Sequence, residues 1–207
     1  NLVTAARMRL ALAGRVATGP AEVVRHRGGE GSVAPIASKK DRQTVTPDGV
    51  SVAPLIDGVV IQRVPPQEDE RGEVVEIWNR TWPGLDFPVV HVYQVSTRPG
   101  QVRAWTMHLR QDDRLFVSRG RLRFGLYDDR EDSPTRGMLS VFTLSDHQRA
   151  MVRIPSGVWH GVQNVGEVDG VFINLPSRPY HYEDPDKFRL PLTNDLIPFD
   201  FGDGRGR

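Results

Sequence analysis

The stretch GQVRAWTMHLRQDDRLFVSRG, residues 100–120, contains three polar positions whose spacing predicts the fold. Thr106, His108 and Asp113 lie between a glycine at each end of this stretch. Because side chains alternate between the two faces of a strand, Thr106 and His108 are expected to share one face. The stretch therefore predicts a strand that presents both side chains to one cavity, followed by a turn and a second strand.

The next stretch, RLRFGLYDD at residues 121–129, has the alternation of a half-buried strand. Leu122, Phe124 and Leu126 alternate with arginine or glycine, which places apolar side chains on one face and charge on the other. Gly120 precedes the stretch and suits a tight hairpin turn, because glycine takes a positive φ without a Cβ clash. We therefore expect two antiparallel strands joined at this glycine.

Similar short runs fill the chain from residue 58 onward, with glycine, proline or aspartate between them at intervals of about ten residues. Such spacing is typical of an antiparallel jelly roll and leaves little room for long helices. The further strands are expected at 58–64, 72–78, 89–96, 102–109, 114–118, 139–144, 150–154, 158–163 and 170–174.

A second stretch, PSGVWHGVQN at residues 155–164, complements the first. Its proline and glycine predict a turn, after which His160 is expected to point into the barrel beside His108. The two stretches match the first and second motifs of the cupin barrels, except that Thr106 occupies the first histidine position. The sequence therefore predicts an all-β cupin, a double-stranded β-helix or jelly-roll barrel.

The composition excludes several classes of function. The 207 residues include 27 basic and 26 acidic side chains, so the net charge of +1 indicates no general attraction to nucleic acid or to a membrane. The absence of cysteine excludes disulfides, thiolate metal sites and a cysteine nucleophile. No stretch is apolar enough for a membrane span or a secretory leader, so we expect a cytoplasmic location.

The chain is expected to consist of an arm and one domain. Residues 1–57 form the predicted N-terminal arm, in which 2–16 are rich in alanine and leucine and favour a short helix. Residues 58–207 form the predicted cupin domain. Its C-terminal tail is rich in proline, which disfavours a long helix or an inner strand, so we expect the tail to wrap the barrel or close its mouth.

Residues 58–201 resemble the dTDP-4-dehydrorhamnose 3,5-epimerase family, whose members are jelly-roll cupins and usually dimers. The resemblance implies an isomerase that needs no metal or other cofactor, and a dTDP-sugar or related keto compound as its small-molecule partner. It rests on the stretches DERGEVVEIW (69–78), VRAWT (102–106), DRLFVSRGRLRFGLYDDREDSPT (113–135), IPSGVWHG (154–161) and YHYEDPD (180–186).

The resemblance also implies roles for individual residues. Arg71 and Arg103 are expected near the pyrophosphate, where guanidinium groups suit phosphate oxygens. Arg114 matches a lysine of the family and is expected to stabilise an enolate oxygen. Tyr180 or Tyr182 matches the tyrosine that returns a proton to the opposite face of the sugar.

Thr106 is the main departure from the family, because it stands where the family has the histidine that removes the proton. An alcohol is too weak a base near neutral pH for this step, so standard 3,5-epimerisation is not expected. His108 or His160 is the expected base instead. Trp105, Thr106 and Gln111 are expected to contact the substrate.

Three functions remain open from the sequence. The first is metal-free proton transfer on a nucleotide-linked keto sugar or a related carbonyl metabolite. The second is a non-catalytic or repurposed ligand-binding cupin in small-molecule biosynthesis. The third is a metal-dependent cupin that binds its ion through His108, Asp113 and His160, which would form a set of two histidines and one carboxylate.

Overall fold

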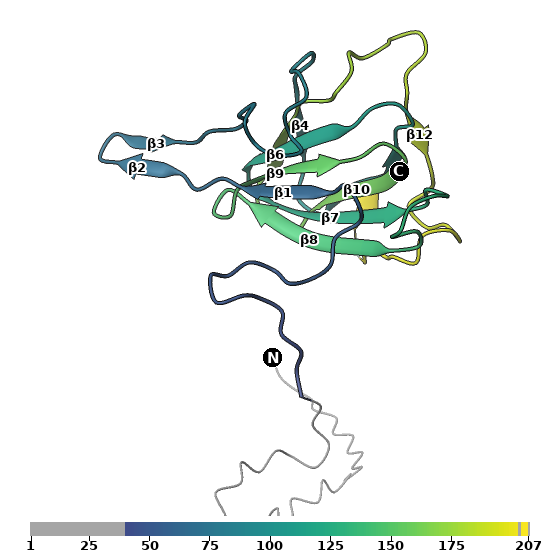
Figure 1. The fold of residues 1–207 in the computed structure, drawn as a ribbon, viewed down its shortest axis with the longest axis horizontal. Coiled ribbons are helices and arrows are strands. Elements are labelled where there is room, and N and C mark those ends of the chain that lie inside the picture. Colours follow the sequence, from purple (N-terminus) through teal and green to yellow (C-terminus); the bar gives the residue numbers. More distant parts are fainter. Residues whose placement is uncertain (1–39, 203, 207) are drawn as a thin grey trace, which may run out of the picture. The chain divides into compact units, whose positions relative to one another are not determined.

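The computed structural model describes residues 40–202 and 204–206 (Figure 1). The chain divides into two compact units, residues 1–42 and 43–207. The helix expected at 2–16 lies outside the described residues. Those that are described form thirteen strands and no helix, and so nothing in this part has the long apolar helix that a membrane crossing would require.

One sheet has five strands, all antiparallel to their neighbours. In spatial order the strands are β1 (Val60–Arg63), β9 (Ala150–Ile154), β6 (Asp113–Arg119), β11 (Gly170–Asn174) and β4 (Tyr93–Thr97). The inner strands are β9, β6 and β11, because each has a hydrogen-bonded strand on both sides.

The second sheet has six strands and contains the strand that precedes His108 and the strand that carries His160. Its main path runs β12 (Phe188–Arg189), β5 (Gln101–Met107), β10 (Val158–Asn164), β7 (Arg121–Asp128) and β8 (Leu139–Ser145). A last short strand, β13 (Arg205–Gly206), pairs with β5 in parallel. The C-terminal segment therefore supplies both strands that pair with β5 on the side away from β10.

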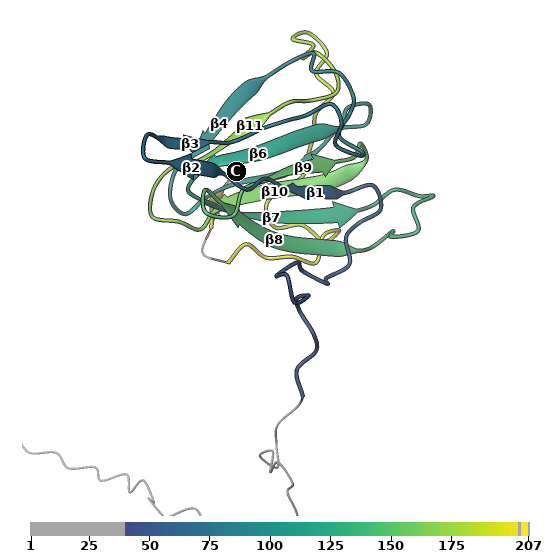
Figure 2. The same ribbon diagram turned by 60° about the vertical axis from the view of Figure 1, so that its left-hand side comes forward.

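A separate hairpin extends away from the two sheets (Figures 1 and 2). It consists of β2 (Gln67–Asp69) and β3 (Gly72–Val74), all six of whose residues are exposed. Another extended feature is the segment between β11 and β12, which arches out from the barrel in both views.

The main apolar core lies between the two sheets. Leu122, Phe124 and Leu126 of β7 are fully buried there, as their alternation predicts, and Phe124 stacks on Phe142 of β8 with ring centres 5.2 Å apart. Leu115 and Val117 of β6 contribute from the five-stranded sheet. These contacts confirm the predicted all-β jelly roll of the cupin type.

The outer face of the six-stranded sheet is covered by the C-terminal tail. Phe201 and Ile197 pack against Trp105 of β5 and Trp159 of β10, and all four side chains are buried. The expected wrapping tail is therefore present. It packs against the outer face of β5, whose inner face lines a cavity.

Candidate active site

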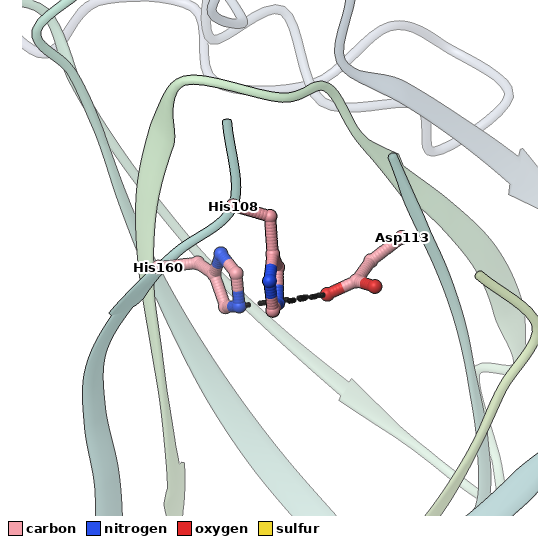
Figure 3. Close-up of side chains that lie close together, drawn as sticks. All are labelled: His108, Asp113 and His160. Atoms are coloured by element: carbon pink, nitrogen blue, oxygen red, sulfur yellow. Dashed lines mark ion pairs between the residues drawn. The ribbon is translucent and has the colours of Figure 1, made fainter. Parts of the chain in front are cut away.

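The two motif strands place two histidines side by side (Figure 3). His160 on β10 is directly paired with Thr106 on β5, and His108 follows the last residue of β5. The two imidazole rings are 5.6 Å apart, centre to centre, and tilted by 34°. Alternation along β5 thus brings Thr106 and His108 to the same cavity, as the sequence predicts.

Asp113 approaches these histidines from the opposite sheet, because it is the first residue of β6. Its Oδ2 atom lies 3.4 Å from Nε2 of His108 and 3.6 Å from Nε2 of His160. Both contacts are drawn in Figure 3. All three side chains are about nine-tenths or more buried, so their mutual charges are weakly screened.

A set of amide donors fixes the orientation of the Asp113 carboxylate. Its Oδ1 atom accepts hydrogen bonds from Nε2 of Gln111 at 2.7 Å and from Nδ2 of Asn174 at 3.1 Å. The same Nδ2 of Asn174 donates to the hydroxyl oxygen of Tyr93 at 2.7 Å. Oδ2 is left facing the two histidines.

Backbone carbonyls fix the tautomer of each histidine. Nδ1 of His108 contacts the carbonyl oxygen of Asp186, and Nδ1 of His160 lies 3.2 Å from the carbonyl oxygen of Val158. A carbonyl only accepts hydrogen bonds, so each Nδ1 carries a hydrogen. In the neutral form, each Nε2 therefore presents a lone pair to the cavity.

The electrostatic environment separates the two histidines. Burial alone would lower the pKa of His108, but the hydrogen bond and charge of Asp113, with the Asp186 carbonyl, raise it above its ordinary value. Burial instead dominates at His160 and lowers its pKa to about 4 despite the charge of Asp113. His160 is therefore neutral near pH 7, and His108 is the imidazole that gains a proton more readily.

Asp113 is the fixed negative charge of the group. Burial opposes its ionisation, but the hydrogen bond from His108, the charges of both histidines and the amide of Asn174 lower its pKa to about 2. It is ionised at neutral pH and stabilises a proton on His108.

The cavity around these residues is large and carries excess positive charge. It has a volume of about 1420 Å³ and extends between the inner faces of β4, β5, β10 and β11. Arg103 is held at its wall by hydrogen bonds to Oγ1 of Thr97 and to the carbonyl of Ser96. The charged lining residues are Arg98, Arg103, Lys187, Arg189 and Arg205 against Asp113 and Asp169.

A second cavity, of about 370 Å³, opens beside the first. Tyr93, His108 and Lys187 line both cavities and so mark their junction. Tyr180 and Gln111 line only the smaller one. The structure therefore brings His108 to the boundary between a large cationic space and a small space with aromatic walls.

Arg114 does not line this site, and its predicted place at the cavity is wrong. Asp113 points inward at the start of β6, so alternation turns Arg114 to the other face of the strand. There its fully buried guanidinium donates to four backbone carbonyls and lies 3.7 Å from the ring centre of Phe87. The carbonyls belong to Leu85, Phe87, Pro88 and Leu175.

Trp105 is also outside the cavity, contrary to the expectation that it contacts the substrate. Thr106 beside it points into the cavity, whereas the Trp105 ring packs on the outer face of the sheet against Phe199 and Phe201. Its Nε1 donates to the carbonyl of Leu192. Its role in this structure is to attach the C-terminal tail to β5.

Arg71 and Tyr182 lie on the surface rather than at either cavity. The Arg71 side chain, on the β2–β3 hairpin, is 82 % exposed and paired with Asp69. Tyr182 is 84 % exposed and packs edge-on against Tyr180. Within the described chain, neither contributes to the walls around His108.

Three residues at the site were not identified from the sequence: Tyr93, Asn174 and Lys187. Tyr93 and Asn174 are paired neighbours on β4 and β11. Burial lowers the pKa of Lys187, and the charge of Arg189 adds to this effect. Side-chain alternation within HVYQVS and VFIN could have placed Tyr93 and Asn174 on the inward face. Lys187 lies in no strand, so alternation says nothing about its direction.

The same three side chains, His108, Asp113 and His160, also have a spacing that fits a metal ion. His108, Asp113 and His160 each offer one ligand atom, and these atoms lie within 4.8 Å of one another. Distances of 3.4 and 3.6 Å between ligand atoms suit a divalent ion bound at about 2.1 Å with tetrahedral angles. Nδ1–H groups held by carbonyls are also the usual support of metal-binding histidines.

Comparison with known proteins agrees with this geometry. Residues 54–191 match the family model described as dTDP-4-dehydrorhamnose 3,5-epimerase. The chain is 40 % identical over 149 residues to a probable low-salt glycan biosynthesis epimerase of Haloferax volcanii, covering 72 % of this chain and 96 % of that protein. It is 31 % identical over 150 residues to the spore coat polysaccharide biosynthesis protein SpsL of Bacillus subtilis, covering 71 % and 97 %.

A solved structure is similar as well. The dTDP sugar isomerase of Desulfovibrio desulfuricans superposes with a TM-score of 0.64 at 29 % identity, over 72 % of this chain and 94 % of that one. The region matched by the family model includes both His108 and His160.

Proposed function

The chain belongs to the dTDP-4-dehydrorhamnose 3,5-epimerase family, and from this membership we propose that it moves a proton on a carbon next to the ketone of a nucleotide-linked sugar, without a metal. The observation that carries the proposal is the contact between His108 and Asp113 at the wall of a cationic cavity. The Asp186 carbonyl holds Nδ1–H of His108, which leaves Nε2 as its basic atom, and the Asp113 charge stabilises the protonated imidazole.

His108 is the proposed base. Its Nε2 takes the proton from the carbon, the electrons of the broken C–H bond form an enolate, and Asp113 stabilises the imidazolium that results. Lys187 replaces Arg114 as the proposed cation near the enolate oxygen, because it lines both cavities where His108 lies. The enolate then collapses when a proton is returned to carbon.

The nucleotide is proposed to occupy the larger cavity. Arg103 is already oriented by two hydrogen bonds, and the other arginines of the lining add positive charge that suits a diphosphate. The sugar ring is then proposed to lie at the junction of the two cavities, because the proposed base lies there.

Thr106 makes standard double epimerisation at carbons 3 and 5 a poor reaction for this protein. It offers no base, and His108 is two residues further along β5, roughly 6.5 Å of strand rise. We therefore propose that the substrate sits differently in this cavity, or that it is a different keto compound from that of the standard enzymes.

Deuterium uptake from D₂O tests the proposed function. The full chain is incubated with dTDP-4-keto-6-deoxyglucose, and exchange at carbons 3 and 5 is followed by NMR. We expect exchange at a carbon beside the ketone by the unmodified protein, and a loss of about 100-fold or more in His108→Gln, the usual size of a general-base contribution. His147→Gln, which changes a histidine whose side chain is 96 % exposed, is the matched control.

Other outcomes identify the alternatives. Tight binding of dTDP without exchange by the unmodified protein would favour the non-catalytic ligand-binding cupin. Exchange that survives His108→Gln unchanged would show that the base is another residue.

We also propose that the protein acts in the cytoplasm as a homodimer, in keeping with its family.

A metal-dependent reaction is the second candidate, because three ligand atoms converge within 4.8 Å at the same place. His108, Asp113 and His160 would hold the ion, and a bound ion would polarise the ketone of the substrate. In that case His108 would not be free to act as the base.

A further inference from the structure

An epimerisation needs a proton donor on the face of the sugar opposite the base. Tyr180 and Tyr182 were the expected donors, but their surroundings do not suit the role equally. Tyr182 is 84 % exposed, and Tyr180, 43 % exposed, lies only on the wall of the smaller cavity. A donor that acts with His108 has to face the junction where His108 lies.

Tyr93 meets this condition. It is the first residue of β4 in the five-stranded sheet, whereas His108 follows β5 in the opposite sheet. Both residues line both cavities, so a sugar ring at the junction would have Tyr93 and His108 on its two sides. The two groups therefore reach the junction from opposite sheets.

The hydrogen bonds of Asn174 leave the Tyr93 proton free. Asp113 is ionised and only accepts, so the NH₂ group of Asn174 must face it, and the same nitrogen lies 2.7 Å from the Tyr93 oxygen. The Tyr93 oxygen is thus an acceptor in this contact. Its own O–H is left to donate toward the cavity.

We propose that Tyr93 is the catalytic acid that returns a proton to the substrate on the face opposite His108. This assignment rests on the proposed function. The O–H bond of Tyr93 breaks as the new C–H bond forms, and the enolate electrons supply that bond while the ketone is restored. Asn174 donates to the resulting phenolate, and exchange with solvent through the cavity returns a proton to Tyr93 and removes one from His108.

The ionisation of Tyr93 supports this role. Burial raises its pKa to about 12, and the charge of Asp113 adds to this effect although the hydrogen bond from Asn174 opposes it. The hydroxyl is therefore protonated throughout the neutral range and available as a donor.

The test separates proton removal from inversion. In Tyr93→Phe, His108 still removes a proton and returns one to the same face, so deuterium uptake into dTDP-4-keto-6-deoxyglucose is expected to persist within a few fold. Formation of the epimer is expected to fall by about 100-fold or more. Tyr127→Phe is the matched control, because Tyr127 packs against the apolar cluster on the outer face of the sheet.

The outcomes that would overturn the assignment are distinct. The assignment would be overturned if Tyr93→Phe formed the epimer as fast as the unmodified protein. It would also be overturned if Tyr180→Phe, rather than Tyr93→Phe, kept deuterium exchange but lost epimer formation. An unmodified protein with neither exchange nor inversion would overturn the proposed function, and this assignment with it. Retained binding of dTDP by calorimetry shows that Tyr93→Phe is folded.

Discussion

Asp113 controls the protonation of His108 at the scale of single residues. The carboxylate lies 3.4 Å from Nε2 of His108, and its charge outweighs the burial that would otherwise lower the histidine's pKa. His160 lies almost as close to the same carboxylate, at 3.6 Å, but remains neutral because burial dominates there. The balance between burial and the charge of Asp113 thus distinguishes two histidines that the sequence alone left as equal alternatives.

The pH dependence of exchange tests this assignment. A base must be unprotonated to act, so the rate of the unmodified protein is expected to fall as the pH drops through a pKa above the ordinary histidine value of about 6.5. Asp113→Asn removes the charge that stabilises the imidazolium, so this acidic limb of the profile should move to lower pH. The measurement is kcat/KM for deuterium uptake between pH 5 and pH 9.

A purely structural role for Asp113 would give a different profile. The kcat/KM of the Asp113→Asn variant would then fall by the same factor at every pH, and the acidic limb of the profile would stay at the same pH. Asp146→Asn is the control, because Asp146 contacts His147, whose side chain is almost fully exposed and remote from the cavity residues.

At the scale of elements, the contact between β5 and β10 depends on Gly161. The pairing register of these strands shifts between His160 and Val162, at this glycine. A Cβ added there would lie 2.5 Å from Cβ of Ala104 and 2.7 Å from Cζ of Phe201. Close approach of the sheet to the C-terminal tail therefore requires a residue without a side chain.

Gly161→Ala is expected to destabilise the fold by about 1–3 kcal/mol, the usual cost of overpacking a core. Urea unfolding followed by tryptophan fluorescence measures the change. The double variant with Ala104→Gly should recover part of the loss, because it removes the nearest atom. If Gly161→Ala were as stable as the unmodified protein, the C-terminal tail would have moved to make room for the added methyl group at no cost in stability.

Most strands could be predicted from the sequence because alternation and turn residues are local signals. The expected strand at 89–96 begins only at Tyr93, and the short strands β2, β12 and β13 were missed because two or three residues carry no periodicity. Trp105 could have been placed outside, since it alternates with Thr106. The outward direction of Arg114 could not have been predicted. The irregular loop between β5 and β6 interrupts the alternation, so the sequence does not show which residue of β6 first points inward.

At the scale of the whole molecule, the proposed metal-free reaction predicts that chelators change neither stability nor activity. Treatment of the full chain with EDTA should leave both the thermal unfolding midpoint and the deuterium exchange rate unchanged. A bound ion stabilises the folded state by mass action, so its removal would lower the midpoint. A fall of several degrees on chelation, reversed by iron, zinc or nickel, would favour the metal-dependent alternative.

The pairing of β5 with the C-terminal segment has a consequence for how the protein is made. In the part of the chain that the structure describes, one edge of β5 pairs with residues 188–190 and 205–206, and Nδ1 of His108 is held by the carbonyl of Asp186. All of these leave the ribosome long after His108 itself. A nascent chain can therefore build most of its core while this edge is still open to pairing with other chains. The geometry of the candidate site is therefore completed late in translation, and a prematurely terminated product would carry both histidines without the Asp186 carbonyl that holds His108.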